Sequence, residues 1–129
     1  MYRPALIVGA IFAMLAVVLG AFGAHSLKPV LTEAQLQTFE TGVRYQFYHS
    51  FALLVVGITY QYLPFRLVKL AGLLFTIGIL LFSGSLYIIT ALKMNGSVGL
   101  KSFGIITPIG GLFFIAGWVT LIIGFFKKK

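Results

Sequence analysis

The chain contains no cysteine and no aspartate, and its only acidic side chains are Glu33 and Glu40. Without cysteine it has no thiol–disulfide chemistry, no thiolate metal site and no lipid anchor on a cysteine. Only 9% of the 129 residues are charged, whereas a typical soluble domain has about a quarter. The composition is therefore not that of an ordinary soluble domain.

Long apolar runs fill most of the chain instead. Hydrophobic residues make up 60% of it, and the mean hydropathy is +1.05. A membrane-spanning helix needs about 20 predominantly apolar residues, and runs that are continuous rather than alternating exclude a β-barrel. We predict an all-α four-transmembrane-helix bundle, a single integral membrane domain over residues 1–129. Its spans are roughly Pro4–Leu27, Val43–Leu63, Leu67–Lys93 and Phe103–Phe126.

A short amphipathic helix is predicted between the first two spans. Thr32-Glu33-Ala34-Gln35 has the pattern of a capping box, in which side chains bind the first free backbone N–H groups of a helix. Leu36 and Phe39 follow at helical spacing on one face. We expect this segment to lie on the outer membrane surface and to bend into the second span near Gly42.

Basic residues beside the spans predict the orientation, because they favour the cytoplasmic side. One side would hold six of them, namely Arg3, Arg66, Lys69, Lys127, Lys128 and Lys129. The other would hold four, namely Lys28, Arg44, Lys93 and Lys101, together with both glutamates. We therefore expect a cell-membrane protein with both termini in the cytoplasm.

Small residues indicate how the helices pack. In lipid, helices associate through close van der Waals contact, so glycine and alanine gather at their interfaces. The first span has small residues four apart, among them Gly9. The fourth has Gly110, Gly117 and Gly124 one heptad apart, a seam that suits a left-handed bundle.

Polar residues from four segments converge on one layer near the outer ends of the spans. We predict that they line an outward-facing ligand site consisting of His25, Arg44, Tyr45, Gln46, Tyr48, His49, Ser83, Ser85, Tyr87 and Thr107. Ionisable groups at membrane depth are costly unless they are paired or hydrated, so they are functional candidates. On the second span, Glu40, Arg44 and Tyr48 form one row, and Thr41, Tyr45 and His49 form the adjacent row. The opposite side, with Phe47, Leu53, Leu54 and Ile58, would face lipid.

Four motif blocks carry a family resemblance. They are Gly20-Ala21-Phe22-Gly23-Ala24-His25, Tyr45-Gln46-Phe47-Tyr48-His49, Phe82-Ser83-Gly84-Ser85-Leu86-Tyr87, and Ile106-Thr107-Pro108-Ile109-Gly110-Gly111 with Gly117-Trp118. In these blocks the chain resembles the domain of unknown function 423 family, small and mostly bacterial four-helix inner-membrane proteins related to the transmembrane protein 256 group. The blocks occur in order over nearly the full length. The resemblance implies fold and location but no reaction, because the family has no established activity.

The sequence gives little support for a catalytic site or a metal site. His25, His49 and Glu40 are residue types that bind zinc-like ions, but they lack a metal-binding spacing. A nucleophile at Ser83 or Ser85 with His49 as base would have no aspartate to orient it. We therefore predict no catalytic residue, no metal and no cofactor.

Two functions remain open. The first is a non-enzymatic membrane protein whose polar pocket binds a small ligand or a lipid headgroup, with Arg44 attracting an anionic group. The alternative is a structural or assembly protein in which the polar layer fastens the helices and the glycine seam forms a homo-oligomer, as a scaffold or a pore. Membrane lipids are the expected partners. Nucleic acid is not, because the basic residues form no stripe on one helix.

Overall fold

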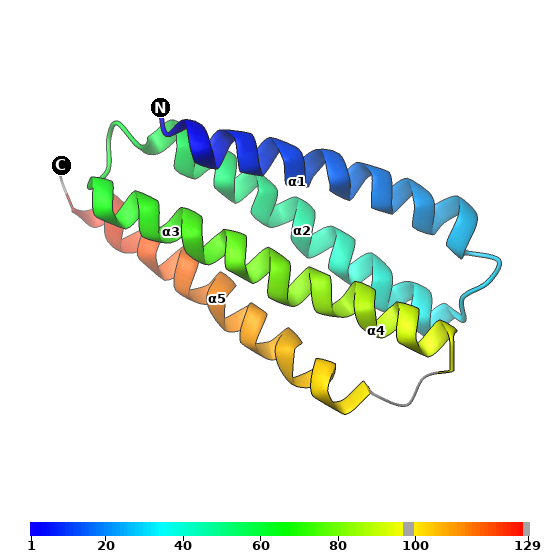
Figure 1. The fold of residues 1–129 in the computed structure, drawn as a ribbon. Coiled ribbons are helices and arrows are strands. Elements are labelled where there is room, and N and C mark those ends of the chain that lie inside the picture. Colours follow the sequence, from blue (N-terminus) through cyan, green and yellow to red (C-terminus); the bar gives the residue numbers. More distant parts are fainter. Residues whose placement is uncertain (97–99, 128–129) are drawn as a thin grey trace.

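The computed structural model describes residues 1–96 and 100–127, and this part of the chain is helical, without a strand. Its elements are α1 (Arg3–Phe22), η1 (Gly23–Leu27), α2 (Glu33–Thr59), α3 (Phe65–Gly78), η2 (Ile79–Ser83), α4 (Gly84–Met94) and α5 (Leu100–Phe126). The π-helical turns η1 and η2 continue their neighbours, so that α1–η1 and α3–η2–α4 are each one long helix (Figure 1). Lys128 and Lys129, which the count of basic residues includes, lie outside the described residues.

Three of the long helices can cross a membrane by length and composition. They are Arg3–Leu27, Phe65–Met94 and Ser102–Phe126, with mean hydropathies of 2.7, 2.1 and 2.2. At 27 residues α2 is equally long, but its first turns and its middle carry polar side chains that lower its hydropathy. Three of the four predicted spans therefore qualify on their own composition.

The predicted surface helix is not a separate element. The capping box is confirmed, since Thr32 Oγ1 accepts a hydrogen bond from the Gln35 N–H at 3.2 Å and Gln35 Oε1 accepts one from the Thr32 N–H at 3.0 Å. From there α2 continues through Gly42 without interruption. Phe39 explains the difference, because it is buried against Gly23 and the Tyr87 ring instead of lying on a membrane surface.

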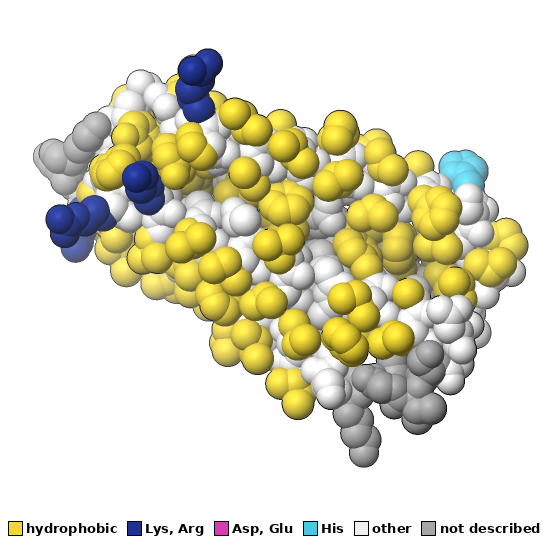
Figure 2. All heavy atoms as spheres, in the orientation of Figure 1, with side chains coloured by type: hydrophobic (Ala, Val, Ile, Leu, Met, Phe, Trp, Pro, Cys, Tyr) yellow, Lys and Arg dark blue, Asp and Glu magenta, His cyan; other side chains and the backbone are white. Residues whose placement is uncertain are grey.

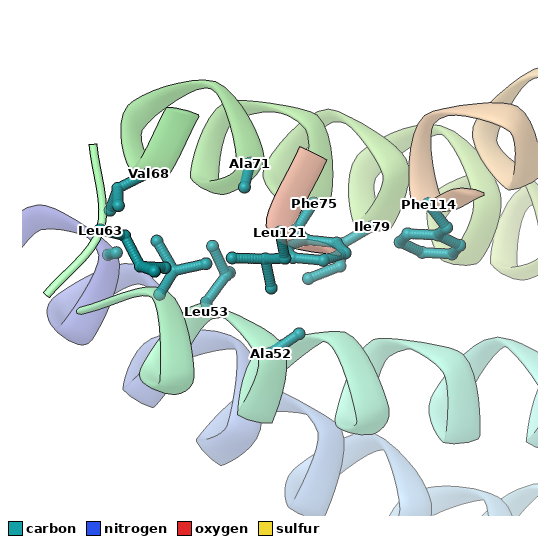
Figure 3. Packing of buried hydrophobic residues seen from close by; sticks show 11 residues of the cluster. Ala52, Leu53, Leu63, Val68, Ala71, Phe75, Ile79, Phe114 and Leu121 are labelled. Carbon is teal, nitrogen blue, oxygen red and sulfur yellow. The ribbon is translucent and has the colours of Figure 1, made fainter. Parts of the chain in front are cut away.

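Two helices form the centre of the molecule, α2 and α3–η2–α4. α1 packs along α2, and α5 packs along α3–η2–α4. The beginning of α1 and the end of α5 lie at the same end of the molecule (Figure 1). The apolar core lies between these helices and includes Leu53, Val68, Phe75 and Leu121 (Figure 3).

The glycine seam of α5 faces into the chain. A Cβ atom at Gly110 would lie 2.4 Å from the backbone nitrogen of Phe82, and one at Gly117 would lie 2.7 Å from the Phe75 ring. In α1, a Cβ atom at Gly9 would lie 2.9 Å from a backbone oxygen of α2. Gly9 and Gly110 thus let backbones approach closely, as predicted, and Gly117 makes room for an aromatic ring. The seam is covered by α3 and η2, so it is not available as the oligomer interface of the alternative hypothesis.

Candidate functional site

Six of the ten predicted site residues meet in the interior, where they make hydrogen bonds between helices. They are Gln46, His49, Ser83, Ser85, Tyr87 and Thr107. We call these six the polar layer. Their bonds join α1, α2, η2, α4 and α5.

Gln46 is the centre of the polar layer because both ends of its amide bind other helices. Its Nε2 donates to the backbone oxygen of Phe12 in α1 at 2.9 Å, and its Oε1 accepts from the Tyr87 hydroxyl in α4 at 2.7 Å. A carbonyl oxygen can only accept, so the contact with Phe12 fixes which end of the amide carries the nitrogen. Only 3% of Gln46 is exposed. This side chain ties α2 to the helices on both sides of it.

Two buried serines connect the α3–η2–α4 helix to two different neighbouring helices. Ser83 donates to the backbone oxygen of Gly42 in α2 at 2.6 Å, while Ser85 shares a hydrogen bond with Thr107 in α5. Residues two apart in a helix point in nearly opposite directions, at about 100° per residue. The Ser83-Gly84-Ser85 sequence therefore reaches both sides of the α3–η2–α4 helix, which lies between α2 and α5.

Both ring nitrogens of His49 are occupied. Nδ1 lies 2.7 Å from the backbone oxygen of Tyr45, and the Trp118 indole nitrogen donates to Nε2 at 3.2 Å. An indole N–H can only donate and a carbonyl can only accept, so the imidazole is the neutral Nδ1–H tautomer. Its ring also stacks on Phe114, with centroids 3.5 Å apart and an angle of 6° between the planes. His49 is therefore a packed and hydrogen-bonded residue without a free nitrogen.

Four predicted residues do not join the polar layer. His25 lies exposed in η1, where Nδ1 is 2.9 Å from the backbone oxygen of Ala21. Arg44, Tyr45 and Tyr48 are exposed on α2, and the Tyr45 ring packs against Phe82.

The predicted rotation of α2 is therefore only partly right, since Ile58 is exposed as expected but other positions are not placed as predicted. The row Glu40-Arg44-Tyr48 faces outward, whereas Leu53, which we expected to face lipid, is only 1% exposed. The reason is that α1 and α3–η2–α4 cover α2 from two sides, which the sequence of α2 does not reveal.

Sequence reasoning missed two residues that complete the polar layer. Trp118 supplies the donor to His49, and Gly42 supplies the acceptor for Ser83. Gly42 also leaves room for the Tyr87 ring, since a Cβ atom there would lie 2.8 Å from the ring. Both residues had a signal, because Trp118 stands in the fourth motif block and Gly42 is a lone glycine beside the polar residues of α2.

Two hollows lie elsewhere on the molecule. One of about 170 Å³ lies between α1 and α3, toward the end with the chain termini. The other, of about 430 Å³, lies at the opposite end, where the connection after η1 meets the start of α2, and both glutamates line it. None of the ten predicted residues lines either hollow.

The chemistry of the polar layer is that of helix–helix hydrogen bonds. Ser83, Ser85 and His49 are all engaged in such bonds, and neither serine is bonded to His49. Among the described residues, no buried side-chain nitrogen or oxygen lacks a hydrogen-bond partner, and no three His, Asp or Glu side chains are grouped as a metal site.

Comparison with known proteins identifies the family. The profile described as "Protein of unknown function (DUF423)" matches residues 19–111, a stretch that contains all ten predicted site residues. The chain is 44% identical over 122 residues to a UPF0382 membrane protein of Staphylococcus aureus (strain bovine RF122 / ET3-1), covering 95% of this chain and 94% of the relative. It is 42% identical over 123 residues to the UPF0382 membrane protein YwdK of Bacillus subtilis (strain 168), covering 95% of each. No solved structure matches the chain. The resemblance seen in the four motif blocks is thereby confirmed, and the chain belongs to the DUF423 family, here represented by UPF0382 membrane proteins.

Proposed function

We propose that this protein is a non-catalytic structural component of the cell membrane, with four spans that its polar layer fastens together. The observation that carries the proposal is the Gln46 amide, which binds α1 through Nε2 and α4 through Oε1. A ligand pocket would need these groups to face open space. They face one another instead, which favours the fastening role over the pocket.

The fourth span in this proposal is α2. Its buried polar side chains, Gln46, His49 and Ser50, all hydrogen-bond within the protein, so they would not meet lipid. Further along, Phe51, Val55 and Ile58 are apolar and exposed, as a lipid-facing surface requires. Its 27 residues reach about 40 Å, which exceeds a hydrocarbon core of about 30 Å.

The positions of the first and last helix ends support an even number of membrane crossings. The beginning of α1 and the end of α5 lie at one end of the molecule (Figure 1), and a chain whose first and last helices begin and end on one side of a membrane crosses it an even number of times. Apolar side chains cover most of the visible face, and the described lysine and arginine side chains on that face gather at the end where α1 begins (Figure 2). We place this end in the cytoplasm, since basic residues favour that side.

Cysteine labelling tests this arrangement, and the absence of native cysteine allows it directly. Single cysteines would replace Glu33, at the start of α2, and Tyr62, just after its end; both positions are exposed. In intact cells, a membrane-impermeant maleimide should label Glu33→Cys but not Tyr62→Cys, and lysis should make both reactive. Labelling of both positions from outside would mean that α2 does not cross, and the four-span proposal would be wrong.

A further inference from the structure

A half-open groove separates α1 from α3 near the end that carries the termini. It encloses about 170 Å³, several times the roughly 30 Å³ that one water molecule occupies in the liquid. Pro4, Ala5 and Val8 of α1 form one wall, Leu73 forms the other, and Leu53 of α2 lies at the floor. The groove exists because α1 packs along α2 rather than along α3.

The groove wall is mostly hydrocarbon. Thr76 also lines it, but its hydroxyl donates to the backbone oxygen of Gly72 in the same helix at 2.8 Å. That hydroxyl therefore already donates its hydrogen bond within α3. A chain of methylene groups fits such a wall, whereas a small soluble ion gains nothing from it.

One cation lines the groove. Lys69 is exposed, and its Nζ lies 4.4 Å from the centre of the Phe65 ring. Arg3, Arg66 and Lys127 are exposed near the same end of the helices, at the beginning of α1, at the beginning of α3 and after α5. Both glutamates belong to the first turns of α2, at the opposite end. The groove thus combines an apolar wall with an ammonium group whose surroundings are basic.

We propose that this groove binds an anionic phospholipid, with an acyl chain along Val8 and Leu73 and the phosphate against the Lys69 ammonium. The proposal rests on the membrane placement proposed above. Phosphate is attracted by lysine as a compact positive charge, and basic side chains at a membrane surface select anionic lipids. A zwitterionic lipid would fill the apolar wall equally well, so the charge of the headgroup is the property that Lys69 selects.

Lipid retention by the purified full-length protein tests the proposal. The protein in mild detergent would be titrated with phosphatidylglycerol or with phosphatidylcholine of identical acyl chains, and retained lipid would be counted by native mass spectrometry. We expect preferential retention of phosphatidylglycerol. Lys69→Gln should weaken its binding about fivefold, the change that corresponds to about 1 kcal/mol for one lysine near an anionic surface. Lys69→Arg, which keeps the charge, should retain it.

Two further variants separate the charge from the apolar wall. Lys28→Gln removes a lysine at the other hollow and should leave phosphatidylglycerol binding unchanged. Val8→Phe enlarges a side chain in the groove wall and should weaken both lipids, while its helix content and elution volume stay those of the parent protein. Equal retention of the two lipids, equal effects of Lys69→Gln and Lys28→Gln, or full displacement of the lipid by inorganic phosphate would overturn the proposal.

The cysteine labels distinguish the two proposals. If Glu33→Cys and Tyr62→Cys react from opposite sides while Lys69→Gln changes nothing, only the lipid site is wrong. If both cysteines react from one side, the four-span proposal fails, and the groove loses the membrane placement on which the lipid site depends.

Discussion

The Tyr87 hydroxyl donates a hydrogen bond of 2.7 Å to Oε1 of Gln46, 41 residues earlier in the chain. The same amide donates to the backbone oxygen of Phe12, so one side chain joins three helices. In hydrocarbon a polar group without a partner is costly, and the reciprocal contacts remove that cost for both residues. The polar layer therefore lets α2 carry glutamine and histidine near its centre.

Gly42→Ala should destabilise the protein, because the new methyl group would lie 2.8 Å from the Tyr87 ring and push it away from Gln46. Overpacking of this kind costs about 1–3 kcal/mol. Gly84→Ala is the matched control, since nothing lies within 4 Å of a Cβ atom there. The free energy of unfolding in mixed micelles measures both variants, and equal values for them would refute this role of Gly42.

Gly110→Ala and Gly111→Ala compare two adjacent glycines of α5. A Cβ atom at Gly110 would meet the Phe82 backbone at 2.4 Å, whereas one at Gly111 would have ordinary contacts at 3.8 Å. We expect Gly110→Ala to lower the melting temperature in detergent and to cost about 1–3 kcal/mol. Gly111→Ala should be neutral or stabilising by up to about 1 kcal/mol, since alanine favours helix over glycine. A stable Gly110→Ala variant would contradict the internal packing of the seam.

His49→Phe should change the fluorescence of Trp118, the only tryptophan in the chain. Phenylalanine retains a ring that can stack on Phe114 but offers no acceptor to the indole N–H. An indole N–H without a partner is destabilising by about 1–3 kcal/mol, so the unfolding free energy should fall as the emission shifts. His25→Phe, on the exposed η1 turn, should change neither quantity. Unchanged emission in His49→Phe would show that the two rings are not bonded.

A pH titration of the parent protein probes the same pair. A proton on His49 Nε2 would break the hydrogen bond from Trp118, and this loss opposes protonation. We therefore expect constant Trp118 emission between about pH 7.5 and 5.5. A titration within that range that His49→Phe abolishes would mean that the imidazole is hydrated, as in the pocket hypothesis.

Much of the fold could be predicted because it depends on local sequence. The first predicted span, Pro4–Leu27, corresponds to the helix Arg3–Leu27, and the capping box at Thr32 gives the start of α2. The predicted second span begins at Val43, ten residues after the first residue of α2, because the first turns of α2 are too polar for a span defined by hydrophobicity. Whether a segment is helical and whether it lies within a membrane are separate properties. Hydrophobicity predicts only the second.

The candidate site was predictable as a set of residues but not as a structure. Convergence of Gln46, Ser83 and Tyr87 follows from helix length and direction. The partners of Gln46 and Ser83 include backbone oxygens of Phe12 and Gly42, and such acceptors have no signature in the sequence. Without knowledge of these acceptors, the same residues are equally compatible with a ligand pocket and with a set of hydrogen bonds that fastens the helices together.

A double-mutant cycle on Gln46 and Tyr87 tests the fastening role most directly. Gln46→Leu, Tyr87→Phe and the double variant would be compared by their free energies of unfolding in mixed micelles. Each single change should cost about 1–2 kcal/mol, and the pair should be coupled by about 1 kcal/mol, within the range measured for hydrogen bonds between membrane helices. Tyr48→Phe, on the exposed face of α2, is the control and should show no coupling to Gln46→Leu. Coupling of about 1 kcal/mol between Gln46 and Tyr87 alone is the predicted result, and additive effects without coupling would contradict the account.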